Sequence, residues 1–129
     1  MAKRILVIDN DSEYVEATEL LLRASGFETL SALNGEEGFD KAVHEKPDCI
    51  LLDVMMKHVS EGLDVAVKLR DDDRTKNIPV ILVTGIRKPD FLASSYSPGE
   101  TWPNLKGTLE KPVKPETLIP LITKAIGAG

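Results

Sequence analysis

The segment Cys49-Ile50-Leu51-Leu52-Asp53 is a short run of apolar residues that ends in a carboxylate. A run without polar alternation suits a strand buried on both faces, as in a parallel sheet covered by helices. Polar groups follow three further strand-like runs: Asp9-Asn10-Asp11 after Arg4–Ile8, Thr84 after Val80–Val83, and Lys111-Pro112 after Gly107–Glu110. The carboxyl ends of parallel strands meet at one edge of the sheet, where open α/β sheets bind ligands. The sequence therefore predicts a site at this edge that combines carboxylates, a hydroxyl and an ammonium group.

Strand-like and helical segments alternate along the chain. Strands are expected at Arg4–Asp9, Phe27–Ala32, Cys49–Asp53, Pro79–Thr84 and Gly107–Glu110. Helices are expected at Ser12–Ser25, from the Asn34 cap to about Glu45, at Leu63–Leu69 and at Pro115–Ile126. Alternation of this kind implies right-handed crossovers and an open parallel sheet with helices on both faces. The predicted fold class is α/β.

Two helix starts have side chains that can cap them. Asp11 or Ser12 can accept hydrogen bonds from the free N–H groups of the first helix. Asn34, followed three residues later by Glu37, resembles a capping box for the second helix. These signals support the boundaries predicted for the first half of the chain.

The composition limits the classes of function. The 129 residues suffice for one domain with one core, and no apolar stretch approaches the length of a membrane span. The net charge of −5 makes the chain a poor candidate for non-specific nucleic-acid binding. The sequence from Met1 leads directly into a strand, and the single Cys49 lies in an apolar strand. We therefore expect no signal peptide, no internal disulfide, and a reducing, cytoplasmic compartment.

The groups at the strand ends suit phosphoryl chemistry. Clustered carboxylates repel each other unless a cation neutralises them, and Mg²⁺ prefers oxygen ligands of this kind. A metal ion, the Thr84 hydroxyl and the Lys111 ammonium would offer positive or donor groups to the three oxygens of a phosphoryl group. The combination is more specific than any one of these residues.

The chain resembles the receiver domains of two-component response regulators over essentially its whole length. The resemblance is carried by Ile5-Leu6-Val7-Ile8-Asp9-Asn10-Asp11, Pro47-Asp48-Cys49-Ile50-Leu51-Leu52-Asp53-Val54-Met55-Met56, Ile78-Pro79-Val80-Ile81-Leu82-Val83-Thr84-Gly85 and Glu110-Lys111-Pro112. It implies a flavodoxin-like, doubly wound sheet of five parallel strands in the order 2-1-3-4-5. It also implies that residues 1–129 form a single receiver domain without an output domain.

The resemblance assigns roles to the residues at the strand ends. Asp53 would accept a phosphoryl group from a histidine kinase or a histidine phosphotransfer protein. Thr84 would bond a phosphoryl oxygen, and Lys111 would pair with the phosphoaspartate. The implied Mg²⁺ ligands are Asp9, Asn10, Asp53 and the backbone carbonyl of Met55. The protein would then be a signalling switch that catalyses only its own phosphorylation and dephosphorylation.

Three positions depart from the family pattern. Asn10 stands where the family usually has Asp, so we expect weaker Mg²⁺ binding unless Asp9 or Asp11 compensates. Thr108 stands where the family usually has Tyr or Phe. The loop after Met55-Met56 is one residue longer than usual, and its His58 is expected to be a solvated loop residue.

The small side chain at Thr108 suggests another route for the output signal. The segment Ile86–Lys106 is longer than its family counterpart, and its prolines limit any helix to about two turns around Asp90–Tyr96. Its Trp102 is a candidate contact for a downstream effector protein, because tryptophan is enriched at binding hot spots.

Two alternatives remain open at the level of sequence. One is a pseudo-receiver, which has the same fold but acts as a protein-binding module and is not phosphorylated. The other is a haloacid-dehalogenase-type phosphatase with Asp9 as its nucleophile. The second fits poorly, because Glu13 occupies a position where that family needs Thr or Val, and only Glu116 supplies an acidic group after Lys111.

Overall fold

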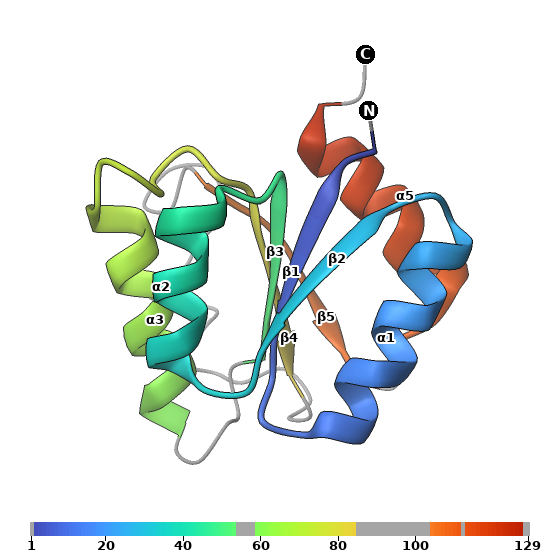
Figure 1. The fold of residues 1–129 in the computed structure, drawn as a ribbon, viewed down its shortest axis with the longest axis horizontal. Coiled ribbons are helices and arrows are strands. Elements are labelled where there is room, and N and C mark those ends of the chain that lie inside the picture. The colour runs from blue at the N-terminus through green and yellow to red at the C-terminus, as the bar shows by residue number, and fades with distance from the viewer. Residues whose placement is uncertain (1, 54–58, 85–103, 112, 128–129) are drawn as a thin grey trace.

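The chain is described from a computed structural model, in which residues 2–53, 59–84, 104–111 and 113–127 are placed. Within these residues, five parallel strands form one sheet in the order β2-β1-β3-β4-β5 (Figure 1). The strands are β1 (Arg4–Ile8), β2 (Glu28–Ala32), β3 (Cys49–Asp53), β4 (Val80–Thr84) and β5 (Leu105–Glu110). The helices are α1 (Ser12–Ala24), α2 (Gly35–Glu45), α3 (Val59–Asp71) and α5 (Pro115–Ile126). The predicted fold class and strand order are confirmed.

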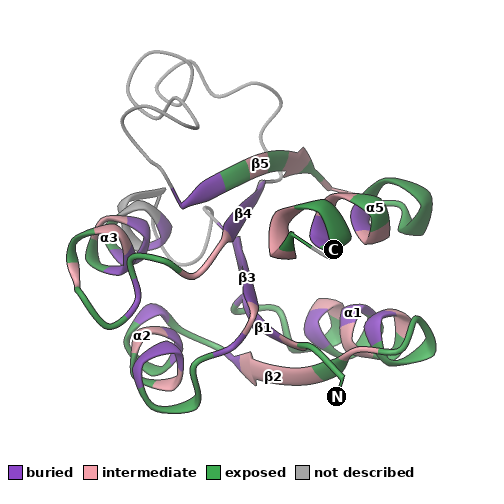
Figure 2. Cartoon of the chain, turned by 90° about the horizontal axis from the view of Figure 1, so that it is seen from above, coloured by how far each residue is buried: buried purple, intermediate pink, exposed green. Residues whose placement is uncertain are grey.

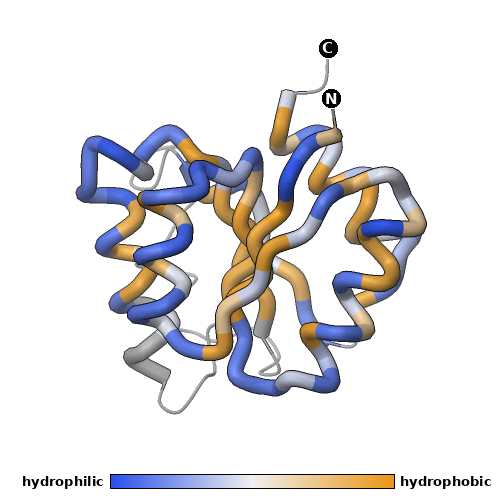
Figure 3. The backbone as a smooth tube through the Cα atoms, viewed as in Figure 1, coloured by the Kyte–Doolittle hydropathy of each residue, from blue (hydrophilic) through white to orange (hydrophobic). Residues whose placement is uncertain are grey.

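The helices cover both faces of the sheet. Viewed from above, α2 and α3 lie on one face and α1 and α5 on the other (Figure 2). Alternate residues of β1 supply the two cores: Leu6 and Ile8 join the cluster under α2 and α3, while Ile5 and Val7 join the one under α1 and α5. In Figure 3 the hydrophobic colour is concentrated along the central strands, and the hydrophilic colour lies mainly on the helices and loops around them. Burial on both faces explains why β1 and β3 have no polar alternation.

Side-chain caps fix the starts of α1 and α2. Asp11, and not Ser12, caps α1, because its Oδ1 accepts hydrogen bonds from the N–H groups of Glu13 (3.1 Å) and Tyr14 (3.2 Å). Asn34 Oδ1 accepts from the N–H of Glu37 at 2.8 Å, and Glu37 Oε1 accepts in return from the N–H of Leu33 at 3.2 Å. Asn34 and Glu37 thus form a variant of the capping box, in which the Glu37 side chain accepts from the residue before the cap and not from the cap residue itself.

One glycine permits close packing beside the carboxyl edge. A Cβ atom built at Gly38 of α2 would lie 2.6 Å from Cδ1 of Ile8 and 2.9 Å from its Cγ1 and Cγ2. Ile8 is fully buried and immediately precedes Asp9. Gly38 therefore lets α2 approach β1 next to the predicted site.

The structure corrects several predicted boundaries. Helix α3 spans Val59–Asp71 and not Leu63–Leu69, because the predicted range included only its apolar face and omitted the polar turns at both ends. Strand β5 begins at Leu105 and not at Gly107, and its pairing with β4 shifts between Val80 and Ile81, so that Lys106 is an extra residue. This bulge interrupts the period of the strand, which explains why its first two residues were missed. At β1, β2, β4 and α1, one predicted end differs from the structure by one residue.

The helix predicted around Asp90–Tyr96 lies outside the described residues, as do Met55, His58 and Trp102. Among the residues that are described, no helix has both the length and the apolar character needed to cross a membrane.

Candidate functional site

Two acidic residues lie side by side at the carboxyl edge of the sheet. Asp9 directly follows β1, and Asp53 is the last residue of β3, the strand paired with β1. Their exposed fractions are 1% and 3%. Asp9 is held on both sides, since its N–H donates to the carbonyl of Ala32 (3.1 Å) and its Oδ1 accepts from the N–H of Asp11 (2.9 Å). Two buried carboxylates in this arrangement need a compensating positive charge.

Lys111 supplies that charge from the opposite end of the chain. It directly follows β5, and its Nζ donates to Oδ2 of Asp9 at 2.8 Å and lies 3.6 Å from Oδ2 of Asp53. One ammonium group thus bridges the two carboxylates, and all three groups lie at the sheet edge where the sequence predicted them. One negative charge of the three groups remains uncompensated, which suits a site for an additional cation.

The surroundings of Lys111 keep its ammonium group charged. Burial by itself would lower the pKa of Lys111, but the hydrogen bond with Asp9 and the charges of Asp53 and Asp9 outweigh it, so the pKa is raised. A raised folded-state pKa means that the stabilising attraction is complete below the ordinary lysine pKa and is lost only as the pH rises through the folded value. The bridge is therefore present at neutral pH.

The backbone places Thr84 beside this group. Thr84 ends β4, where it pairs with Glu110, the residue before Lys111. The preceding residue of β4, Val83, pairs with Asp53. The sheet therefore brings the three strand ends that bear Asp53, Thr84 and Lys111 into adjacent positions.

Two further metal ligands were predicted, Asn10 and the backbone carbonyl of Met55. Asn10 is exposed in the turn between β1 and α1, and Met55 lies outside the described residues. One oxygen of Asp11 serves as the cap of α1, so this carboxylate has a structural task besides any role in charge compensation. The two buried carboxylates are oxygen donors of the kind that a hard divalent cation such as Mg²⁺ prefers, and the amide of Asn10 directly follows Asp9 in the chain.

Tyr14 is a member of the site that the sequence analysis missed. The Nζ of Lys111 lies 4.2 Å from the centre of the Tyr14 ring. The ring also lines a small hollow that Asp9 and Asp53 border, with the apolar residues Val7, Ile8, Leu51 and Val83. One feature of the sequence could have pointed to Tyr14. It lies on the first turn of the helix that directly follows the acidic cluster Asp9-Asn10-Asp11. Tyr14 is an aromatic residue on a helix, so a pattern of polar groups at strand ends does not include it.

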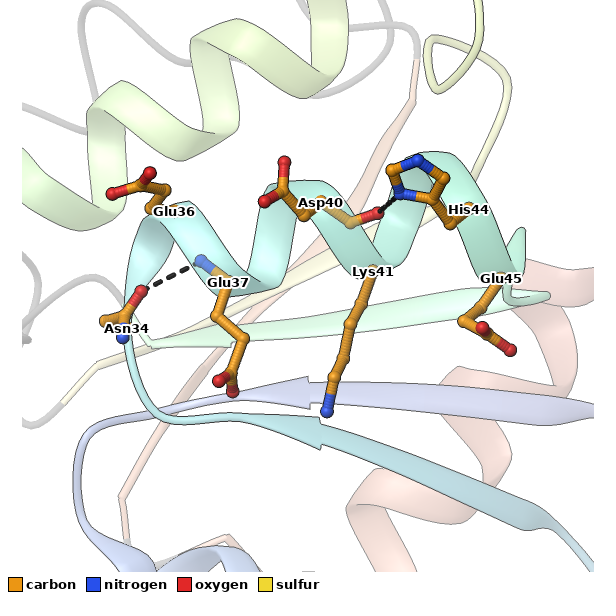
Figure 4. Close-up of a pocket in the computed structure, with 7 residues that line it drawn as sticks. All are labelled: Asn34, Glu36, Glu37, Asp40, Lys41, His44 and Glu45. Carbon is orange, nitrogen blue, oxygen red and sulfur yellow. Dashed lines mark hydrogen bonds between the residues drawn. The ribbon is translucent and has the colours of Figure 1, made fainter.

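A second hollow lies along α2 and is unrelated to this site. It is lined by Asn34, Glu36, Glu37, Asp40, Lys41, His44 and Glu45 (Figure 4). The ring Nδ1 of His44 is hydrogen bonded to the carbonyl oxygen of Asp40 at 2.8 Å. Apart from Asn34, its lining comes from a single helix and includes none of the groups at the strand ends. This hollow therefore does not bring together groups from several strands, as the carboxyl edge of the sheet does.

Comparison with known proteins agrees with the geometry. Residues 5–123 match the family model of the response regulator receiver domain. The polar-differentiation response regulator DivK of Brucella anthropi is 39% identical over 84 residues, which cover 65% of this chain and 68% of DivK. The response regulator PleD of Caulobacter vibrioides is 41% identical over 86 residues, which cover 67% of this chain but 19% of PleD.

Solved structures show the same architecture. The chemotaxis protein CheY4 of Vibrio cholerae superposes with a TM-score of 0.82 at 25% identity, covering 97% of this chain and 99% of CheY4. The family match and the fold set aside the haloacid-dehalogenase alternative. With a buried pair of strand-end aspartates bridged by a strand-end lysine, the chain belongs to the response regulator receiver domains, the phosphate-accepting switches of two-component signalling.

Proposed function

We propose that Asp53 accepts the phosphoryl group, with a histidine kinase or a histidine phosphotransfer protein as the donor. The observation that carries the proposal is the bridge from Lys111 to both Asp9 and Asp53. It places a fixed positive charge within 3.6 Å of the carboxylate that would be phosphorylated.

The residues at the site have distinct tasks in this transfer. A carboxylate oxygen of Asp53 bonds to phosphorus as the bond from phosphorus to the donor's imidazole nitrogen breaks. The product carries more negative charge than the original carboxylate, because a phosphoryl group brings about −1.5 to −2 charges at neutral pH. The ammonium of Lys111 stabilises this charge, and the hydroxyl of Thr84 donates to a phosphoryl oxygen.

Receiver domains generally bind Mg²⁺. In this chain Asp9, Asn10, Asp53 and the backbone carbonyl of Met55 would hold the ion. When bound, it supplies further positive charge to the phosphoryl oxygens. The amide of Asn10 contributes an oxygen without a charge, so the affinity should be lower than that of a site with three carboxylates.

The output is proposed to pass to a downstream effector protein through the segment Ile86–Lys106 and its Trp102. Thr108, which is exposed on β5, is too small to act as the aromatic switch of the family. Trp102 is the only tryptophan, so its fluorescence reports directly on this segment. Emission and quenching should change on phosphorylation, and identical spectra in both states would exclude this route.

Phosphorylation by acetyl phosphate, with and without Mg²⁺, tests the main proposal. Intact-mass spectrometry should show one added phosphoryl group on the wild type and none on Asp53→Asn. Asp64→Asn is the matched control, because Asp64 is an exposed carboxylate on α3 and should not alter the adduct. An adduct that persists in Asp53→Asn would contradict the assignment. A wild-type protein that takes up no phosphoryl group would instead favour the pseudo-receiver, a binding module with the same fold.

A further inference from the structure

The Tyr14 ring has no task in the phosphoryl transfer described above, although it lies against one of the groups that perform it. Its ring centre is 4.2 Å from the Nζ of Lys111, inside the distance of about 6 Å at which a cation is attracted to an aromatic face. Lys111 thus has three partners, the carboxylates of Asp9 and Asp53 and the face of Tyr14.

The ring is held in place by its own helix. The N–H of Tyr14 donates to the capping carboxylate of Asp11, which fixes the first turn of α1. The side chain of Thr18, one turn further along and 6% exposed, acts on the Tyr14 hydroxyl and lowers its pKa. Burial raises the pKa of Tyr14 despite the opposing effects of Thr18 and Lys111, so the hydroxyl stays protonated and the ring neutral. A half-buried ring on a fixed helical turn can position a flexible lysine.

We propose that Tyr14 is a positioning residue that holds the ammonium group of Lys111 at the phosphorylation site, an inference that rests on the proposed function of Asp53. A lysine side chain has four rotatable bonds, so its ammonium is otherwise free to leave the site for solvent. Attraction to a ring face is less directional than a hydrogen bond. The ammonium can therefore shift from Asp9 toward a phosphoryl group on Asp53 while keeping contact with the ring.

The contact can be measured without any phosphorylation. The ring current of Tyr14 should shift the ε-methylene protons of Lys111 upfield in the NMR spectrum of the wild type. Tyr14→Phe keeps the ring and should keep the shift, whereas Tyr14→Leu should move these protons to ordinary lysine values. Unshifted protons in the wild type, or equal shifts in the wild type and Tyr14→Leu, would overturn the proposal.

The kinetic consequence is measured with acetyl phosphate and Mg²⁺. Tyr14→Leu should slow the phosphorylation of Asp53 by about 3- to 10-fold, the range expected for losing one partly buried cation–π contact, and Tyr14→Phe should restore the wild-type rate. Val15→Ala controls for loss of packing, because Val15 is buried on the same helix. It should leave both the ring-current shift and the rate unchanged.

The two proposals fail in different ways. A wild-type protein that is not phosphorylated refutes the role of Asp53, and the ring-current comparison then decides alone whether Tyr14 holds Lys111. A phosphorylated wild type with equal rates in the wild type and Tyr14→Leu refutes only the positioning role.

Discussion

Lys111 and Asp9, which are 102 positions apart in the sequence, share a hydrogen bond of 2.8 Å at the edge of the sheet. The same ammonium lies 3.6 Å from Asp53, so one cation compensates two almost fully buried carboxylates. The charge balance of the site therefore depends on a single side chain, which directly follows the edge strand β5.

Replacing Lys111 by methionine should destabilise the protein. The change keeps most of the apolar side chain but leaves two buried carboxylates without their cation, which should cost about 1–3 kcal/mol of unfolding free energy. Urea denaturation at neutral pH without divalent cations measures the loss. Lys76→Met is the control, because Lys76 pairs with Asp73 on the surface and its removal should change stability by less than about 0.5 kcal/mol. Equal effects of the two changes would show that the bridge contributes nothing.

Changing Asn10→Asp should tighten Mg²⁺ binding and speed phosphorylation by acetyl phosphate. A third carboxylate adds ligand charge, which sets much of the affinity of a site for a hard cation. Calorimetric titration with MgCl₂ measures the affinity directly. Asp11→Asn is a matched control that removes a charge one position away and retains an oxygen able to cap α1. If Asn10→Asp binds Mg²⁺ as weakly as the wild type or more weakly, the assignment of Asn10 as a metal ligand is contradicted.

Gly38→Ala should destabilise the protein although alanine favours helices. The new Cβ would lie within 2.9 Å of three side-chain atoms of Ile8, and the β-branched Ile8 has few other rotamers in which to escape. The expected net loss is about 1–2 kcal/mol after the gain in helix propensity. Thermal unfolding measures it, with Asp40→Ala, on the exposed side of α2, as the control for propensity. Comparable melting temperatures for Gly38→Ala and the wild type would mean that α2 can move away at no cost.

Asp72 should titrate well below an ordinary aspartate. Hydrogen bonds from the side chain and the backbone N–H of Arg74 lower the pKa of Asp72 to about 2. Because the folded-state pKa is depressed, the contribution of this pair to stability is complete above the unfolded value and is lost as the pH falls toward 2. Carboxyl ¹³C NMR measures the pKa, which should rise toward the ordinary aspartate value of 3.8 in Arg74→Gln. An unchanged titration in that variant would exclude the side chain of Arg74 as the cause.

The sequence predicted the fold and the site best where a buried strand ends in a polar residue, because burial identifies the strand and the parallel direction places its end. Apolar runs that end in polar residues predicted the parallel sheet and brought Asp9, Asp53 and Lys111 to one edge. The bulge at Lys106 was not predictable, since an extra residue in a strand breaks the period on which strands are recognised. Tyr14 was missed for a different reason. Its contact with Lys111 depends on the distance between α1 and the end of β5, which no local pattern encodes.

The sheet order also dictates when the site can be completed during synthesis. Strands β2, β1 and β3 are neighbours, and all three are made within the first 53 residues, together with α1 and α2. The growing chain can therefore pair its inner strands early, when Asp9 and Asp53 already face each other. Their shared cation arrives only with residue 111, after β4 and β5 have been added. Until then a nascent chain holds two acidic groups at an incomplete edge, so we expect the last strand to add to a folding intermediate whose charge is unbalanced.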